Sequence, residues 1–157
     1  PSVVVEGEIG YIGSSSKVLD KIPEGIELTK VEDAIKFVRE TGVDMLAPAV
    51  GNIHGIVKTG EPRLNVEHIK LIKEAVKIPL VLHGASGNSD ADIKSAIKAG
   101  ISIVHINTEV RVAWQAALVN FIKNHPKEIA PYNILSNEEE VAYKVIKDKL
   151  SLYSGLQ

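Results

Sequence analysis

The feature that most constrains the fold is a regular alternation of short apolar runs with segments of helical periodicity. Four runs rich in β-branched residues are typical of strands: Ser2–Ile9, Val43–Val50, Pro79–His83 and Ile101–Ile106. Each is followed by a segment in which apolar residues recur every three or four positions, which predicts a helix. Strands joined by single helices pair in parallel through right-handed crossovers. The pattern therefore predicts an α/β fold of four β/α units with one more helix at the carboxyl-terminal end.

Capping residues indicate where the helices begin. Thr29 with Glu32 predicts a capping box for the first helix, which Gly42 ends, and Ser136 with Glu139 predicts one for a last helix that runs to about residue 151. The other three helices are expected to start at Asn65, near Ser89 and at Thr108. The segments 13–25 and 51–64 are predicted to be loops, because both contain glycine and proline.

Chain length limits the architectures that this pattern allows. An open doubly wound sheet and part of a (β/α)₈ TIM barrel both fit four β/α units. A complete barrel takes roughly 250 residues, so a chain of 157 residues could form only about half of one. We expect one domain over residues 1–157. The start at Pro1, directly before an apolar run, suggests a cut end.

Composition disfavours several classes of protein. The net charge of −2 and seven aromatic residues are unlike a nucleic-acid-binding domain. No apolar run reaches the ~18 residues that a membrane span needs, so we expect neither nucleic acid nor membrane as a partner. The chain has no cysteine, which excludes disulfides and thiolate metal sites and fits a cytoplasmic location.

Two histidines follow successive predicted strands at the same end of the sheet. His54 comes after the second strand, and His83 ends the third. Because neighbouring strands lie ~4.8 Å apart, the two imidazoles could converge on one ion with metal–nitrogen bonds of ~2.0–2.1 Å. Histidines whose hydrogen bonds are satisfied by protein groups are the alternative.

Glycine follows both histidines, as Gly55 and Gly84. Glycine permits a positive φ and a close approach of the backbone to a ligand. The segment Gly84, Ala85, Ser86 leads into a predicted helix, and Asn107 with Thr108 precedes another, so their N–H groups could bind an anion. Ordinary turns and caps would look the same.

Charged and polar residues share faces of two other strands. Glu6 and Glu8 alternate onto one face of the first strand, where they could serve a metal or acid–base chemistry, or form structural ion pairs. His105 and Asn107 share a face by the same two-residue period.

Four motifs together resemble one enzyme family. GNIHGIVK (Gly51–Lys58), VLHGASG (Val81–Gly87) and INTEVRVAW (Ile106–Trp114) are similar to the carboxyl-terminal half of class II, zinc-dependent fructose-bisphosphate aldolases and their tagatose-bisphosphate relatives. VEGEIGYIG (Val5–Gly13) is similar to their VEAELGxxGG segment. The resemblance implies a (β/α)₈ barrel, of which this chain supplies strands five to eight.

The resemblance also implies roles for individual residues. His54 and His83 would be two of three histidine ligands to a catalytic zinc, and Glu8 would belong to a second site for a divalent or monovalent cation. The implied substrate-binding residues are Gly55, Gly84, Ala85, Ser86, Asn107 and Thr108. His105 stands where the family usually has an asparagine against the substrate, so we expect it in the substrate site.

The implied reaction is the reversible cleavage of fructose 1,6-bisphosphate to dihydroxyacetone phosphate and glyceraldehyde 3-phosphate in glycolysis. The family's third zinc histidine and catalytic aspartate are expected upstream of Pro1, so this chain alone should be inactive. Its partners would be a phosphorylated ketose and either further copies of itself or a complementary amino-terminal half. The family's mobile-loop glutamate falls near Ser14–Ser16, where this sequence has serines. The alternatives are a tagatose-bisphosphate aldolase and a non-catalytic half-barrel that binds sugar phosphates.

Overall fold

A computed structural model describes residues 3–15, 17–136 and 138–155. The chain forms two compact units, Pro1–Ile106 and Asn107–Gln157, and each is described by itself. The expectation of a single domain stays a prediction. Ser2 and Ser16, which belong to segments discussed above, lie outside the described residues.

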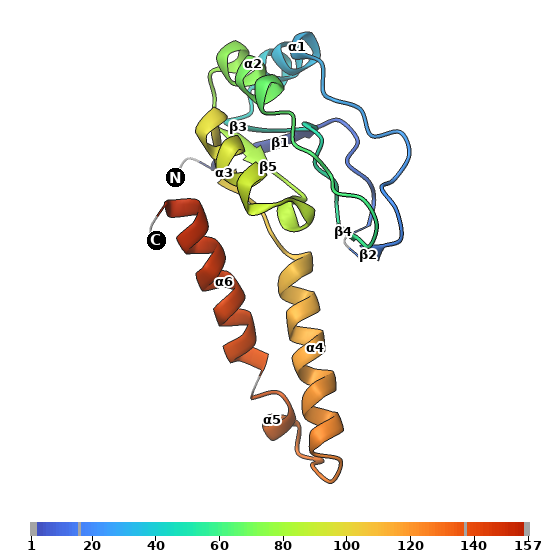
Figure 1. Cartoon of the computed structure of the whole chain (residues 1–157). Helices are drawn as coiled ribbons and strands as arrows, with labels where there is room; N and C mark the ends of the chain where they lie inside the picture. The colour runs from blue at the N-terminus through green and yellow to red at the C-terminus, as the bar shows by residue number, and fades with distance from the viewer. Residues whose placement is uncertain (1–2, 16, 137, 156–157) are drawn as a thin grey trace. The chain divides into compact units, whose positions relative to one another are not determined.

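The first unit is built on a four-stranded parallel sheet (Figure 1). In spatial order its strands are β1 (Glu6–Ile9), β3 (Met45–Pro48), β5 (Leu80–Leu82) and β6 (Ile101–Val104). The strands are added in chain order in one direction, with β1 and β6 at the two edges. Each strand lies within a run predicted from the sequence, so the expected parallel α/β fold is confirmed.

Three helices connect these strands. They are α1 (Val31–Thr41), α2 (Val66–Val76) and α3 (Asp90–Ala99), and α2 packs against both α1 and α3. Right-handed crossovers that advance in one direction place their helices on the same face of the sheet. This arrangement is that of a singly wound sheet, whereas a doubly wound sheet reverses its strand order at a switch point.

The caps of α2 and α3 are as predicted, but that of α1 is not. The side chains of Asn65 and Ser89 accept hydrogen bonds from backbone N–H groups in the first turns of α2 and α3. The capping box predicted at Thr29 is wrong. The Thr29 hydroxyl instead donates to the Ile9 carbonyl at 2.8 Å and accepts from the Ala49 N–H at 2.9 Å. It is buried between β1 and β3, so it ties these strands together and leaves α1 without a side-chain cap.

Two segments predicted as loops contain short strands. β2 (Val18–Leu19) and β4 (Ile56–Val57) pair in parallel as a second, two-stranded sheet. A single 3₁₀ turn, η1 (Ala85–Gly87), follows β5. Strands of two residues carry too little periodicity to be found in a sequence.

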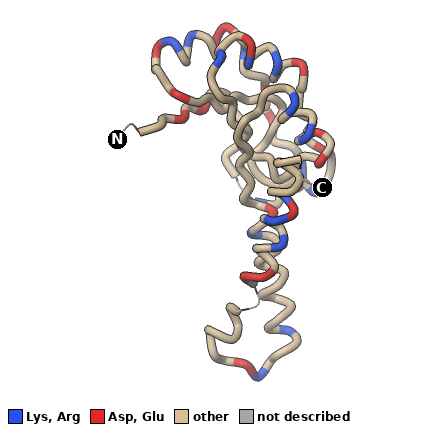
Figure 2. Tube along the Cα trace, turned by 90° about the vertical axis from the view of Figure 1, so that its left-hand side faces the viewer, with Lys and Arg blue, Asp and Glu red and all other residues tan. Residues whose placement is uncertain are grey.

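The core of the first unit lies between the sheet and its helices. Its largest fully buried apolar side chains include Leu46, Ile53, Ile69, Ile72, Leu80, Leu82 and Ile93. Lysines and arginines alternate with acidic residues along the outer helices (Figure 2). The buried residues of the three helices, which include Ala34, Ile69, Ile72, Ile93 and Ala96, are among the apolar positions that predicted the helices.

The second unit is a helical hairpin (Figure 1). It contains α4 (Thr108–Asn124), a short α5 (Pro131–Ile134) and α6 (Glu138–Ser154), with α4 packed against α6. The Lys149 ammonium lies 3.1 Å from the Glu109 carboxylate, and both side chains are only 19% exposed. The Ser136 hydroxyl donates to the Asn133 carbonyl, and the residue between Ser136 and α6 lies outside the described range. Across the described residues, no helix combines the length and apolar character needed to cross a bilayer.

Candidate metal-binding site

Beyond the paired residues of β3 and β5, a side chain links the segments that follow the two strands. The Leu46 N–H donates to the Pro79 carbonyl across this pair of strands. The next donor toward β5 would be at position 48, but Pro48 has no N–H. Two residues further on, the Val50 N–H donates to Asn52 Oδ1 at 2.8 Å.

The amide of the same asparagine completes the connection. Asn52 Nδ2 donates to the carbonyl of His83 at 2.9 Å, and the Asn52 side chain is fully buried. A primary amide can accept and donate at once, so the Asn52 side chain connects the two segments where a direct backbone hydrogen bond would otherwise do so. Asn52 therefore sets the position of the His83 backbone relative to the loop that carries His54.

Two imidazoles and one carboxylate converge at this end of the sheet. The centroids of the His54 and His83 rings lie 6.3 Å apart. His83 Nδ1 lies 2.6 Å from Glu8 Oε2, which reaches it from β1. One ligand atom from each of Glu8, His54 and His83 lies within 4.8 Å of the others. The convergence of His54 and His83 expected from their shared strand end is therefore present.

Glu6 contacts the opposite side of the same imidazole. Its Oε1 lies 2.7 Å from His83 Nε2, and the side chains of Glu6 and His83 are 25% and 18% exposed. Glu6, His83 and the exposed His105 form a second group whose ligand atoms lie within 4.8 Å of one another. Imidazole with carboxylate is a donor set that suits zinc and neighbouring divalent transition metals. The residues present thus fit a metal of this class.

The two glycines next to the histidines adopt the positive φ that was expected. Gly55 has a φ of 100° and Gly84 a φ of 62°. A Cβ on Gly55 would collide with the carbonyl of Lys17, and one on Gly84 with the carbonyl of Ile53. At both glycines, the backbone atoms that lie close belong to neighbouring loops of the same chain.

The remaining expected substrate residues lie in two places. Ala85 is buried in η1 and its N–H points to the His105 carbonyl at 3.4 Å, while Ser86 beside it is half-buried. Asn107 is the N-cap residue of α4 and Thr108 is its buried first residue, so both belong to the second unit.

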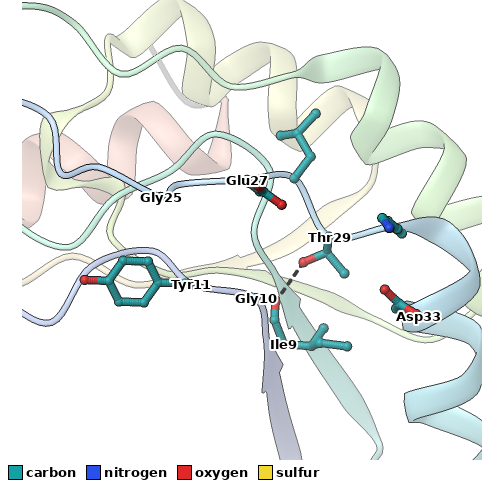
Figure 3. A pocket seen from close by; sticks show the side chains of 9 residues that line it. Ile9, Gly10, Tyr11, Gly25, Glu27, Thr29 and Asp33 are labelled. Carbon is teal, nitrogen blue, oxygen red and sulfur yellow. Dashed lines mark hydrogen bonds between the residues drawn. The ribbon is translucent and has the colours of Figure 1, made fainter.

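A separate hollow of about 320 Å³ lies beside the end of β1 (Figure 3). Its lining includes Gly10, Tyr11, Glu27, Thr29 and Asp33. No histidine lines it, and the hydroxyl of Thr29 is already engaged with both strands. This hollow is distinct from the histidine group.

Comparison with known proteins places this geometry in a family. The family model described as fructose-bisphosphate aldolase class II matches residues 2–155. The chain belongs to this family. Class II aldolase relatives include the curated YdjI of Escherichia coli K12, called an uncharacterized protein, which is 44% identical over 90% of this chain and 48% of its own length.

Two further relatives carry names that state a reaction. The sulfofructosephosphate aldolase of Alkalicoccus urumqiensis is 34% identical over 96% of this chain and 52% of its own length. The 6-phospho-5-dehydro-2-deoxy-D-gluconate aldolase of Shouchella clausii is 35% identical over 98% and 51%. The chain spans about half the length of these curated relatives.

A solved structure of the family shares the fold. The crystal structure titled YdjI aldolase, from Escherichia coli K12, superposes with a TM-score of 0.75 at 37% identity, over 96% of this chain and 49% of that one. The recognition of the class II aldolase family from the sequence motifs is confirmed.

Sequence reasoning gave Asn52 no role and did not commit Glu6 to the site. The pairing of Glu6 with Glu8 on one strand face was a usable signal for the second carboxylate. The local sequence does not show the role of Asn52, because its second partner, the His83 carbonyl, lies 31 positions away in the chain.

Proposed function

We propose that this chain contributes a zinc-binding group to an aldolase that cleaves a phosphorylated ketose. The observation that carries the proposal is the convergence of His54, His83 and Glu8 at the carboxyl edge of a parallel sheet, in a chain of the class II aldolase family. Ligands and catalytic groups gather at this edge in parallel α/β folds.

The residues of this chain would hold the metal and orient the side chains that bind it. His54 and the Nδ1 side of His83 would supply the imidazole nitrogens, with the Glu8 carboxylate beside Nδ1. The amide of Asn52 holds the His83 backbone from the buried side. A bound zinc would supply Lewis-acid stabilisation of the charge that develops on the substrate carbonyl.

Phosphate recognition is assigned to the loops around the histidines. We propose that backbone groups of Gly55, Gly84, Ala85 and Ser86 serve a substrate phosphate. For Asn107 and Thr108, at the start of α4, we propose a phosphate-binding role on the family resemblance alone. His105 is exposed after β6 and would contact the carbon chain of the substrate. Fructose 1,6-bisphosphate is the substrate we propose first, with glycolysis as its setting, and tagatose bisphosphate is the alternative.

The remaining half of the barrel would come from outside the matched region. Because β1 and β6 are the edges of the sheet, their open backbone groups can pair with another chain. We propose strands five to eight of a (β/α)₈ barrel, in a cytoplasmic protein. A complementary amino-terminal half or a second copy would cover the edges, and the third zinc histidine and the catalytic aspartate would come from the complementary half.

The proposal is tested by measuring zinc content and aldol cleavage together. The chain is assayed with fructose and tagatose bisphosphates, alone and after mixing with a separately expressed amino-terminal half of a family barrel. We expect cleavage only in the mixture, and a strong loss of zinc affinity in His83→Ala. Stoichiometric zinc without cleavage in either sample would favour a non-catalytic half-barrel that binds sugar phosphates. Unchanged zinc content in His83→Ala would remove His83 as a ligand.

A further inference from the structure

A second set of potential ligands surrounds the other nitrogen of His83. Glu6 reaches His83 from β1, two strands from β5, and His105 reaches it from the end of β6, the strand next to β5. Three strands therefore bring one carboxylate and two imidazoles together within the first unit. Their ligand atoms lie within 4.8 Å of one another.

The imidazole pair in this set is more compact than the pair His54 and His83. The centroids of His83 and His105 lie 4.9 Å apart with ring planes at 19°, against 6.3 Å for His54 and His83. Two imidazoles bound to one tetrahedral ion through ~2.1 Å bonds have centroids roughly 5 Å apart. Because the rings are nearly parallel, binding requires a turn of the His105 ring. His105 is exposed, so that turn displaces no core side chain.

Each of the two ring nitrogens of His83 faces a carboxylate. Glu6 Oε1 lies 2.7 Å from Nε2 and Glu8 Oε2 lies 2.6 Å from Nδ1. An ionised carboxylate only accepts, so each contact places a proton or a cation between ring and oxygen. In a tetrahedral metal shell two such ligand atoms are roughly 3.4 Å apart, so a metal at Nε2 requires the Glu6 contact to open by less than an ångström.

We propose that Glu6, His83 Nε2 and His105 form a binding site for a divalent transition-metal ion, distinct from the His54 and Glu8 side of the same ring. Two imidazoles and one carboxylate leave further coordination positions open to water or a ligand. All three residues lie in the first unit. The site therefore depends neither on residues outside this chain nor on the aldolase reaction.

Cobalt titration of the full chain tests the proposal, because tetrahedral Co²⁺ bound by histidine absorbs visible light. His54→Ala disables the other side of the ring and should retain one Co²⁺ bound with affinity within about threefold of the parent. In that background His105→Ala should weaken Co²⁺ binding at least tenfold and change the visible spectrum, and Glu6→Gln should do the same. His125→Ala is the matched control, since its ring stacks on Phe121 in the second unit, and it should change neither property.

The proposal is overturned if His54→Ala binds no Co²⁺, or if adding His105→Ala leaves affinity and spectrum unchanged. Far-UV circular dichroism verifies folding, and His105→Gln replaces the alanine variant if that variant fails to fold. The outcome is separable from the aldolase proposal. No cleavage by the parent chain mixed with the amino-terminal half, together with Co²⁺ retained in His54→Ala, would refute only the reaction. Cleavage in that mixture without Co²⁺ binding in His54→Ala would refute only this site.

Discussion

Replacing Asn52 with alanine should destabilise the first unit by a large amount for a single substitution. Asn52→Ala leaves the Val50 N–H and the His83 carbonyl without their partner at once. A buried group that loses its hydrogen bond costs about 1–3 kcal/mol. The His83 side chain is part-exposed, so water can reach part of that site and reduce the cost there. We therefore expect a loss of about 2–4 kcal/mol in the free energy of unfolding.

Urea denaturation followed by circular dichroism measures this loss. The midpoint should fall while the slope with denaturant stays constant, since the area exposed on unfolding is nearly unchanged. Asn120→Ala is the control, because Asn120 is exposed on α4 and its side chain accepts a hydrogen bond from Asn124, which is also exposed. It should shift stability by no more than about 0.5 kcal/mol. A loss below about 1 kcal/mol for Asn52→Ala would refute the bridging role.

Two further perturbations follow from contacts described above, and a third from hydrogen bonds to Glu128 in the turn between α4 and α5. Gly84→Ala adds both backbone strain and a collision with the adjacent loop, whereas Gly42→Ala adds only strain of about 1–2 kcal/mol. Equal shifts in the urea midpoint would contradict the collision. Thr29→Val should lower the melting temperature through a loss of about 1–3 kcal/mol, and an unchanged value would show that its hydroxyl does not tie β1 to β3. Hydrogen bonds, first from the Ala130 N–H, lower the pKa of Glu128 below 4.5. Its stabilisation is therefore present above pH 4.5 and lost as the pH falls through the lower folded pKa, and an NMR titration midpoint at or above 4.5 would be inconsistent with this.

Structural features that depend on residues within one helix or strand were predictable from the sequence. The strand runs and helical periods located all four strands of the main sheet, and Asn65 and Ser89 cap because their partners lie three residues away. Thr29 has the same local signature, but its burial places two strand groups within reach of the hydroxyl. Tertiary contacts therefore outweighed the capping preference there.

The site was only partly predictable for the same physical reason. The shared strand end was sufficient to bring His54 and His83 together, because parallel strands deliver their following residues to one edge. The contact between Glu6 and His83 spans 77 positions in the chain, and its choice of nitrogen depends on ring orientation. Such details follow from packing and have no signature in a single sequence.

Pro48 has a consequence for how the spacing of the loops that carry His54 and His83 could evolve. A residue with an N–H at position 48 could form one more backbone hydrogen bond between β3 and β5. That bond would draw the two loops together without changing His54, His83 or Glu8. The spacing of the segments that carry His54 and His83 thus depends in part on a backbone position that contributes no side chain to the histidine group.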